Sequence, residues 1–542
     1  MVNFMDKKII IGAIIVVLVI IVAAFAFTGT SNDSDPTHLV VAAHSNIAEP
    51  EAGFNPLTGW GCGHQNYNPL IQSCLFKTDS DGEIVPDIAT NYSISSDGKT
   101  WTVDLRDDIV FSDNSTLNAE DVAFTFNTAR ATESDLDLTN IKDVKAVNDT
   151  TVDFKLVEPR STFIYDLRYV GIVPSDTYDN ATYGENPIGS GPYVLDHWDK
   201  GQQAIFKIND NYYGDKPYFT QITMLFPEES TWLELAKSGE ADVVPVATSS
   251  LNQTVDGYQF VEKSAGRAQG VSLPYLEDTG IVTDDGYKVG NNVTADKSIR
   301  QALNVGIDRQ KMVDEVFSGH ASPEYTGVDT RDYANPDAKV DDADVDKAKQ
   351  ILREGGWKDS DGDGIVEKDG VKASFDLYYP PDYLDRQSLS TVFAEQAKDI
   401  GIEVNLQGAD WDTIYANMYS SAALMQQTSP DPYKSIYQQY HSKEMDGFYM
   451  NPNLYNNSAS DKLMEQAMST GDFNQANSLW SQSALVNGEG WGPAGDAPWV
   501  WIANYDYNYF IKDGIDIGEQ PDGLGNDILI NIQDWTRNNS TA

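Results

Sequence analysis

The side chains best suited to metal chemistry lie in the glycine-rich loop Gly59-Trp-Gly-Cys-Gly-His64. Its Cys62 and His64, in a Cys-x-His spacing, could offer two donors to one borderline metal ion. The only other cysteine is Cys74, twelve positions beyond Cys62. In an exported protein two such cysteines form a disulfide or remain separate thiols, and both alternatives stay open.

Other side chains have the chemistry to hold an organic ligand. Arg168 is the arginine best placed to clamp a carboxylate with two parallel hydrogen bonds, although a salt bridge would explain it equally. Trp60, Trp411 and Tyr415 could stack on a ligand, and the alternative for each is a place in the core.

One acidic run is similar to the start of a calcium-binding loop. Asp359, Asp361 and Asp363 occupy its positions one, three and five, and Gly364 occupies position six. Position twelve, where a bidentate glutamate belongs, is Gly370. The pattern therefore departs from a calcium loop where the strongest ligand should be, and a plain turn is the alternative.

No arrangement of residues indicates catalysis. The six histidines are scattered, and the sequence contains neither a Gly-x-Ser-x-Gly elbow nor a Gly-x-x-x-x-Gly-Lys phosphate loop. The 83 acidic residues include no pair that stands out as a hydrolase dyad. The sequence favours a binding protein without a resident cofactor over an enzyme.

Length and charge restrict the class of protein further. A chain of 542 residues is too long for one hydrophobic core, so two or more lobes are expected. The formal charge of −46 excludes nucleic acid and anionic lipid surfaces as partners, because both would repel the chain.

The N-terminal segment predicts export. Lys7 and Lys8 precede an uninterrupted apolar run over 9–27, long enough to span a bilayer with the N-terminus in the cytoplasm. We expect residues 1–30 to form an uncleaved signal-anchor; a signal peptide cleaved near Ala24-Phe-Ala26 is the alternative. Residues 31–37 would be a spacer. Several Asn-x-Ser/Thr sequons suit a glycoprotein tethered to an archaeal type of cell surface.

Apolar periodicity and turn residues predict the elements that position these side chains. Strands are expected at 39–43, 92–95, 101–105, 193–198, 203–208, 240–246, 374–379, 401–406, 499–503 and 505–510. Helices are expected at 118–126, 230–239, 295–308, 309–319, 344–353 and 389–400. Strand and helix alternate in the second half, as in βα units that build a covered sheet.

An ordered set of short motifs gives the most specific signal. The set includes Phe54-Asn-Pro-Leu57, Ser96-Asp-Gly-Lys-Thr-Trp101, Asn186-Pro-Ile-Gly-Ser-Gly-Pro-Tyr193, Gly239-Glu-Ala-Asp242 and Ile299-Arg-Gln-Ala-Leu303. In the residue types, order and spacing of these motifs, the chain resembles the substrate-binding proteins of peptide and nickel ABC importers. The resemblance extends from about His38 to Trp535.

The resemblance implies an α/β fold of the two-lobed type II periplasmic-binding-protein (Venus flytrap) class with an additional N-terminal subdomain. Lobe I would comprise 38–267 and the returning segment 498–542, and lobe II would comprise 268–497. The ligand would be captured between the lobes and delivered by a monomeric receptor to ABC permease subunits, with ATP hydrolysis on a separate chain.

The resemblance also implies particular site residues. His64 lies in a loop that lines the cleft in similar receptors. Asp431 corresponds to an aspartate that pairs with a peptide's α-ammonium group. The preceding residues Gln426-Gln-Thr428 differ from the tryptophan and glycine that are usual there. A turn before proline is the alternative role of Asp431. His441 corresponds to a histidine that touches a nickel chelate, so His64 and His441 are the expected metal contacts.

The ligand is therefore expected to be a nickel chelate, slightly favoured, or a short peptide. A surface glycoprotein that uses the same fold as a scaffold, and an exported hydrolase, are the alternative functions.

Overall fold

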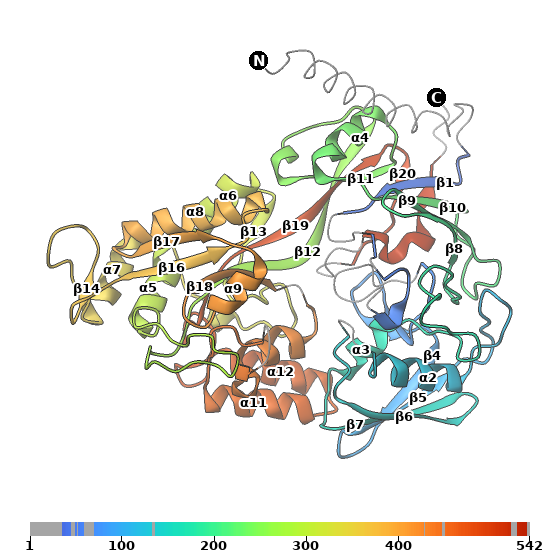
Figure 1. Ribbon diagram of the computed structural model, residues 1–542, viewed down its shortest axis with the longest axis horizontal. Helices are drawn as coiled ribbons and strands as arrows, with labels where there is room; N and C mark the ends of the chain where they lie inside the picture. The colour runs from blue at the N-terminus through green and yellow to red at the C-terminus, as the bar shows by residue number, and fades with distance from the viewer. Residues whose placement is uncertain are drawn as a thin grey trace, which may run out of the picture.

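The computed structural model describes residues 35–44, 49–50, 52–58, 70–132, 136–427, 429–446, 450–521 and 528–538. Within them the ribbon divides into two halves joined by the long strands β12 (Tyr258–Ser272) and β19 (Trp499–Lys512) (Figure 1). We call the half that contains β1 the first lobe and the half that contains β16 the second lobe. No helix of the described residues is long and apolar enough to cross a membrane, and the apolar run 9–27 lies outside them.

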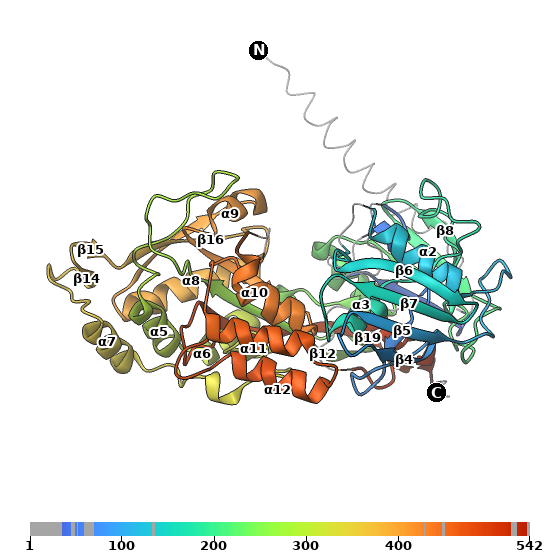
Figure 2. The ribbon, with the colours of Figure 1, turned by 90° about the horizontal axis from the view of Figure 1, so that it is seen from below.

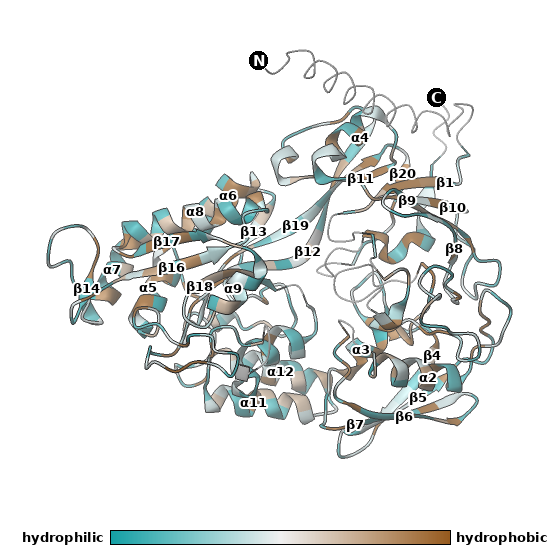
Figure 3. Ribbon diagram, in the orientation of Figure 1, coloured by the Kyte–Doolittle hydropathy of each residue, from teal (hydrophilic) through white to brown (hydrophobic). Residues whose placement is uncertain are grey.

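One sheet runs through both lobes in the order β17-β16-β18-β12-β19-β11-β1-β10-β9-β8. The first lobe contributes β1 (His38–Ala42), β8 (Tyr193–Asp199), β9 (Gln203–Ile208), β10 (Gln221–Leu225) and β11 (Val243–Pro245). The second lobe contributes β16 (Ser374–Tyr379), β17 (Glu403–Gly408) and β18 (Ala422–Gln427). The strand β1 is apolar along most of its length, as its brown colour in Figure 3 shows, whereas β16 alternates between buried and half-buried residues. The buried residues of both strands enter the cores of the two lobes.

The strands β12 and β19 pair antiparallel from Tyr258 opposite Lys512 to Ser272 opposite Trp499. Their register shifts twice, between Lys263 and Arg267 and again between Gln269 and Gly270. Bulges of this kind bend a strand and change the direction of the side chains that follow. The connection between the lobes is therefore a bent, two-stranded ladder.

A four-stranded sheet with the order β4-β5-β7-β6 forms a separate part of the first lobe. Its strands are β4 (Ala89–Ile94), β5 (Thr100–Leu105), β6 (Ile141–Asn148) and β7 (Thr151–Leu156), accompanied by α2 (Ala119–Ala129) and α3 (Phe163–Tyr169). The predicted cap of α2 is confirmed, because Asn118 and Asp121 form a reciprocal capping box. Trp101, Phe126 and Phe154 pack in its core.

Helices cover the sheet of the second lobe. They are α5 (Lys297–Gly306), α6 (Arg309–Phe317), α7 (Val345–Glu354), α8 (Leu384–Asp399) and α9 (Trp411–Asn417). Two further helices, α11 (Ser458–Ser469) and α12 (Phe473–Ser483), lie on the side of this lobe that faces the four-stranded sheet (Figures 1 and 2). They pack through Met464, Ala467 and Trp480.

Several expectations about the elements require correction. The two strands predicted at 499–503 and 505–510 are one continuous strand, β19, because Asn504 continues the ladder instead of interrupting it. The full length of β12 and the helices α11 and α12 were not predicted from the sequence. The predicted lobe boundaries at 267/268 and 497/498 fall inside β12 and just before β19.

Candidate functional site: the interlobe cavity

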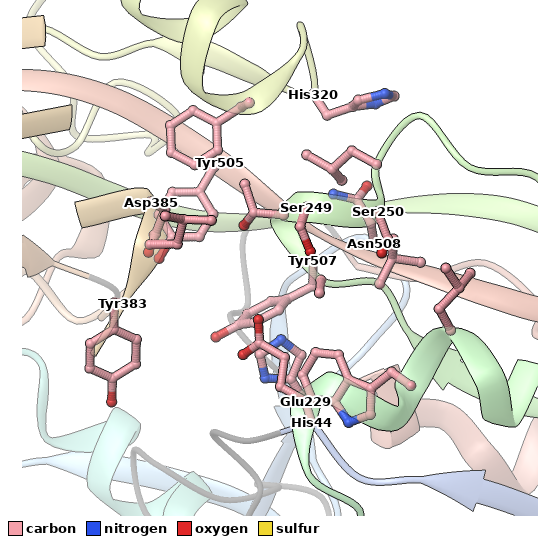
Figure 4. A pocket seen from close by; sticks show the side chains of 18 of the residues that line it. His44, Glu229, Ser249, Ser250, His320, Tyr383, Asp385, Tyr505, Tyr507 and Asn508 are labelled. Carbon is pink, nitrogen blue, oxygen red and sulfur yellow. The ribbon is translucent and has the colours of Figure 1, made fainter. Parts of the chain in front are cut away.

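A cavity of about 550 Å³ lies between the lobes, beside the crossing strands (Figure 4). The strands themselves contribute Arg267, Tyr505, Asp506 and Tyr507 to its wall. The remaining charged and aromatic wall residues come from both lobes: His44, Glu229, Trp232 and Glu234 from the first, and Phe317, His320, Asp382, Tyr383, Asp385 and Arg386 from the second. We call it the interlobe cavity. Its size is in the range that small-molecule sites occupy.

Two buried arginines meet at one end of the interlobe cavity. The Oε1 atom of Gln426 accepts a hydrogen bond of 3.0 Å from Nη2 of Arg267 and another of 2.8 Å from Nη2 of Arg386. Arg267 is 7% exposed and Arg386 is 5% exposed. The two guanidinium groups, which we call the arginine pair, therefore share a single neutral acceptor.

Aromatic rings enclose the arginine pair. The guanidinium carbon of Arg267 lies 4.4 Å from the ring centre of Tyr505 and 4.7 Å from that of Tyr507. The corresponding distances from Arg386 are 4.6 Å to Tyr383 and 5.1 Å to Trp411. Such rings attract a cation and fix its orientation, but they do not neutralise its charge.

Neither arginine of the pair forms an ion pair among the described residues, although the charge of Asp385 on the same cavity wall also acts on Arg267. The arginines there that form ion pairs are Arg106, Arg160, Arg309 and Arg537. Nε of Arg267 and Nη1 of Arg386 also lack a hydrogen-bond partner within the described part of the chain. Burying charge without a partner is unfavourable, so this end of the cavity suits an anion. A planar carboxylate matches the donor geometry of guanidinium groups.

Imidazole and acidic groups line the rest of the interlobe cavity. Desolvation, with a smaller contribution from the charge of Arg267, lowers the pKa of His44 to about 3. Its ring lies edge-on to Tyr507, with 4.6 Å between ring centres. His44 is therefore neutral at pH 7 and suited to a borderline metal ion.

Two of the acidic residues that line the interlobe cavity, Glu229 and Asp385, interact from opposite lobes. Burial raises the pKa of Glu229 in the first lobe, and the charge of Asp385 in the second lobe raises it further. In Figure 4 Glu229 lies beside His44, and Asp385 lies beside Tyr505. A metal ion or an ammonium group between the lobes would relieve this repulsion.

Local structure explains these positions. The register shift before Arg267 changes the direction of its side chain within β12. Asp385 and Arg386 occupy the first turn of α8, directly after the loop that ends at Tyr383. Nε2 of Gln269 donates a 3.3 Å hydrogen bond to Asp385, which links the crossing strand to the second lobe.

Two of the aromatic residues predicted from the sequence lie next to the site. Trp411 and Tyr415 stack at 5.4 Å on α9, and Trp411 packs against Arg386, on the wall of the interlobe cavity. Trp60, His64 and Cys62 lie outside the described residues, so their predicted roles stay predictions. Cys74 is a buried free cysteine, and burial raises the pKa of its thiol. The predicted disulfide and the alternative of separate thiols both stay predictions, because Cys62 lies outside the described residues.

Arg168 does not line the interlobe cavity. It lies buried in α3, where its guanidinium donates hydrogen bonds of 2.6 Å to Thr78 Oγ1 and to the Tyr169 hydroxyl. The alternative salt bridge is not seen at this position among the described residues, and the predicted ligand contact stays a prediction. Arg168 instead binds neutral hydroxyl groups within the first lobe.

Asp431 and His441 also lie away from the interlobe cavity. Asp431 is 0% exposed and pairs with Arg160 at 3.0 Å. His441 is 1% exposed and stacks on Tyr437, with ring centres 4.2 Å apart. Its Nδ1 accepts a hydrogen bond from the backbone N–H of Lys443. The structure thus brings neither residue to the arginine pair.

The acidic run predicted as a turn or a calcium loop does gather its carboxylates. Asp359, Asp361, Asp363 and Glu367 each place one oxygen within 4.8 Å of the others. All four groups already have partners in the chain: Asp363 binds Lys372, Glu367 accepts hydrogen bonds from Ser360, and Asp359 and Asp361 accept backbone hydrogen bonds within the turn. The first three acids are exposed, which suits the alternative of a solvated turn.

Sequence reasoning missed the residues of the arginine pair. Arg267 offers one signal, since a charged residue among Ala265, Gly266 and Ala268 needs a polar partner when it is buried. Arg386 offers none, because a lone arginine in the first turn of a helix resembles any solvated one. The two become a site only when α8 packs beside β12.

Two lobes joined by a bent ladder, with a polar cavity between them, form the architecture of a two-lobed solute-binding receptor. The chain belongs to the bacterial extracellular solute-binding proteins, family 5, whose middle-region model matches residues 83–447. The resemblance inferred from the motifs is thereby confirmed.

Individual relatives are similar over most of their length. Protein XP55 of Streptomyces lividans is 30% identical over 91% of this chain and 88% of its own. The oligopeptide-binding protein AppA of Bacillus subtilis is 28% identical, covering 81% of this chain and 82% of its own. The crystal structure of NikZ from Campylobacter jejuni with Ni(L-His) has a TM-score of 0.75 at 21% identity, over 93% of this chain and 100% of NikZ. That last likeness concerns the fold alone.

Proposed function

We propose that this chain is the extracytoplasmic substrate-binding protein of an ABC importer. It captures a small solute with a carboxylate in the interlobe cavity and delivers it to membrane permease subunits. The observation that carries this proposal is the arginine pair, which is buried, shares one neutral acceptor and faces a cavity between the lobes. Membership of the solute-binding family supports the same function.

The ligand we favour is a nickel chelate of a small amino acid, and a short peptide is the second candidate. In a chelate, carboxylate oxygens would meet the arginine pair while the metal ion approaches His44 and the two acids, Glu229 and Asp385. In a peptide, the C-terminal carboxylate would meet the arginine pair, and the ammonium group would meet the two acids. The names of two relatives, the oligopeptide-binding protein AppA and the nickel-binding periplasmic protein of Escherichia coli, support both classes.

Transport would depend on closure of the lobes around the ligand. A ligand shifts a hinged protein toward its closed form only if it makes more favourable contacts there. Here the anion-binding group Arg386 and the acid Asp385 belong to the second lobe, whereas His44 and Glu229 belong to the first. A ligand that bridges these groups therefore stabilises the closed form. The apolar segment 9–27 would hold the receptor at the membrane.

A thermal-shift panel tests this proposal. The full-length protein in detergent is heated with Ni²⁺ alone, Ni²⁺ with histidine, or di- to pentapeptides. A true ligand at a hundredfold excess over its Kd should stabilise the folded state by about 2.7 kcal/mol. Arg267→Met and Arg386→Met should each remove most of that shift.

Arg353→Met is the matched control, because Arg353 is exposed in the last turn of α7. It should keep the full shift. If the arginine-pair variants respond to every ligand as the unmodified protein does, the proposed site is wrong.

A further inference from the structure

The lobes make a second contact, outside the wall of the interlobe cavity. Arg160 lies in the first lobe, between β7 and α3, and Asp431 lies in the second lobe, shortly after β18. Nη2 of Arg160 donates a 3.0 Å hydrogen bond to Oδ2 of Asp431. Neither residue lines the interlobe cavity. This contact therefore links the lobes without involving the ligand site.

The guanidinium group of Arg160 is fully engaged and buried. Its Nη1 donates a 2.8 Å hydrogen bond to Asp166, and its Nε donates one of 3.2 Å to Thr162. The side chains of Arg160, Asp166 and Asp431 are 2%, 5% and 0% exposed. The ring of Tyr433, from the second lobe, lies 4.1 Å from the guanidinium carbon. The second lobe thus supplies both a counter-charge and an aromatic cover.

Backbone hydrogen bonds beside Arg160 continue the same contact. The N–H of Ser161 donates to the carbonyl of Met468, and the Ser161 hydroxyl donates to the carbonyl of Ala467, each at 2.8 Å. Both acceptors lie near the end of α11. The contact is therefore a continuous polar interface that fixes the lobes at a defined separation.

The charges show what opening would change. Asp166 belongs to the same lobe as Arg160, so that pair survives when the lobes separate. Asp431 has no other cation within ion-pair distance among the described residues, and it would have to be hydrated. A fully buried carboxylate is tolerated only beside a charge partner. Burial of Asp431 is thus coupled to the closed arrangement.

We propose that the Arg160–Asp431 ion pair is a latch that populates the closed form of the receptor before any ligand binds. Its role goes beyond capture of a solute, because it sets how much of the closing free energy the ligand must supply. When only a fraction of the protein is binding-competent, the apparent Kd rises by the inverse of that fraction. Loss of the latch should therefore raise the apparent Kd of every ligand by the same factor.

The titration of Asp166 agrees with this role. Burial raises its pKa to about 6; Arg160 and Lys434 act against the rise, whereas Asp431 and Asp137 add to it. Opening would expose Asp166 to water and return its pKa toward the ordinary value. The closed form then holds more protons near pH 5, so acid favours closure. When Asp166 is protonated, Asp431 is the remaining charged partner of Arg160.

Fluorescence energy transfer in the ligand-free, full-length protein tests the latch. Donor and acceptor fluorophores enter as unnatural amino acids at Val147 and Val371, exposed residues of the first and second lobes. Asp431→Asn keeps the shape of the side chain and should lower the closed-to-open ratio at least tenfold. Asp166→Asn, the matched control on the same guanidinium, should not open the lobes.

The outcomes separate the latch from a general effect on folding. Equal opening in both asparagine variants, or no opening in Asp431→Asn, would overturn the proposal. If Asp431→Asn fails to fold, Tyr433→Leu removes the aromatic cover instead and should also open the lobes. Because no ligand is added, the result does not depend on the importer function proposed above.

Discussion

His44 connects the chemistry of the cavity to the pH of the solution. Its folded-state pKa of about 3 lies well below the ordinary value of 6.5. At pH 5 the unfolded chain binds a proton at this residue and the folded chain does not. The contribution of neutral His44 to the free energy of unfolding is therefore complete above pH 6.5, and it decreases as the pH falls toward 3.

We expect the folded state to lose about 2 kcal/mol through His44 between pH 7.5 and pH 5. Urea unfolding at the two pH values measures this, and His44→Gln should lack that part of the pH dependence. His197→Gln is the control, because the side chain of His197 is 59% exposed. An identical pH dependence in His44→Gln and the unmodified protein would show that His44 is charged in the fold.

The crossing strands are the element on which the site depends. Gly270 lies on β12 opposite Trp501 of β19. A Cβ atom added to Gly270 would lie 2.7 Å from Cε3 of Trp501 and 2.9 Å from its Cα. The backbone of β19 cannot move away without disturbing the ladder that links the lobes.

Gly270→Ala should therefore destabilise the protein by about 1 to 3 kcal/mol, as overpacking does elsewhere. Chemical denaturation measures the change. Gly471→Ala is the control, because nothing lies within 4 Å of the added Cβ and the site is a loop. A neutral result at Gly270 would mean that the two strands separate easily, contrary to a rigid ladder.

Capping and turn residues in the sequence predicted the ends of several helices correctly. Asn118 and Gly239 marked helix ends that the structure confirms. The long strand β12 was harder to predict, because Gly266 and Gly270 and two cations break its pattern, although its partner β19 holds it extended. The helices α11 and α12 are rich in serine and asparagine, and only their packing in the second lobe makes them stable.

The candidate site was predicted less completely for a related reason. The lobes, the cleft and the class of protein follow from motifs that the chain carries in order. The arginine pair joins residues more than a hundred positions apart. Arg267 has only the weak signal of a charge among small residues, and no local pattern distinguishes Arg386 from a solvated arginine. Asp431 was singled out, but its partner Arg160 was not, so the latch was not foreseen.

The net charge acts on the molecule as a whole. With 83 acidic and 37 basic residues, two lobes that approach each other repel across solvent. Salt shortens the range of this repulsion, from about 30 Å at 10 mM to about 3 Å at 1 M ionic strength. Buried ion pairs such as Arg160–Asp431 are screened much less.

We therefore expect high salt to favour the closed form, as measured by energy transfer between Val147 and Val371 at 10 mM and 1 M sodium chloride. Asp431→Asn should respond in the same direction, because the repulsion does not arise at the latch. If added salt opens the lobes instead, attraction between exposed charges dominates the interface.

The pairing of Ser272 with Trp499 has a further consequence for how the chain is built. These residues mark the points where the polypeptide leaves and re-enters the ladder, and they face each other across it. Residues 273–498 are thus, in topological terms, one insertion at the tip of a β-hairpin. A short turn could join the two positions, which offers a route to a minimal scaffold and to grafting a different solute-contacting half.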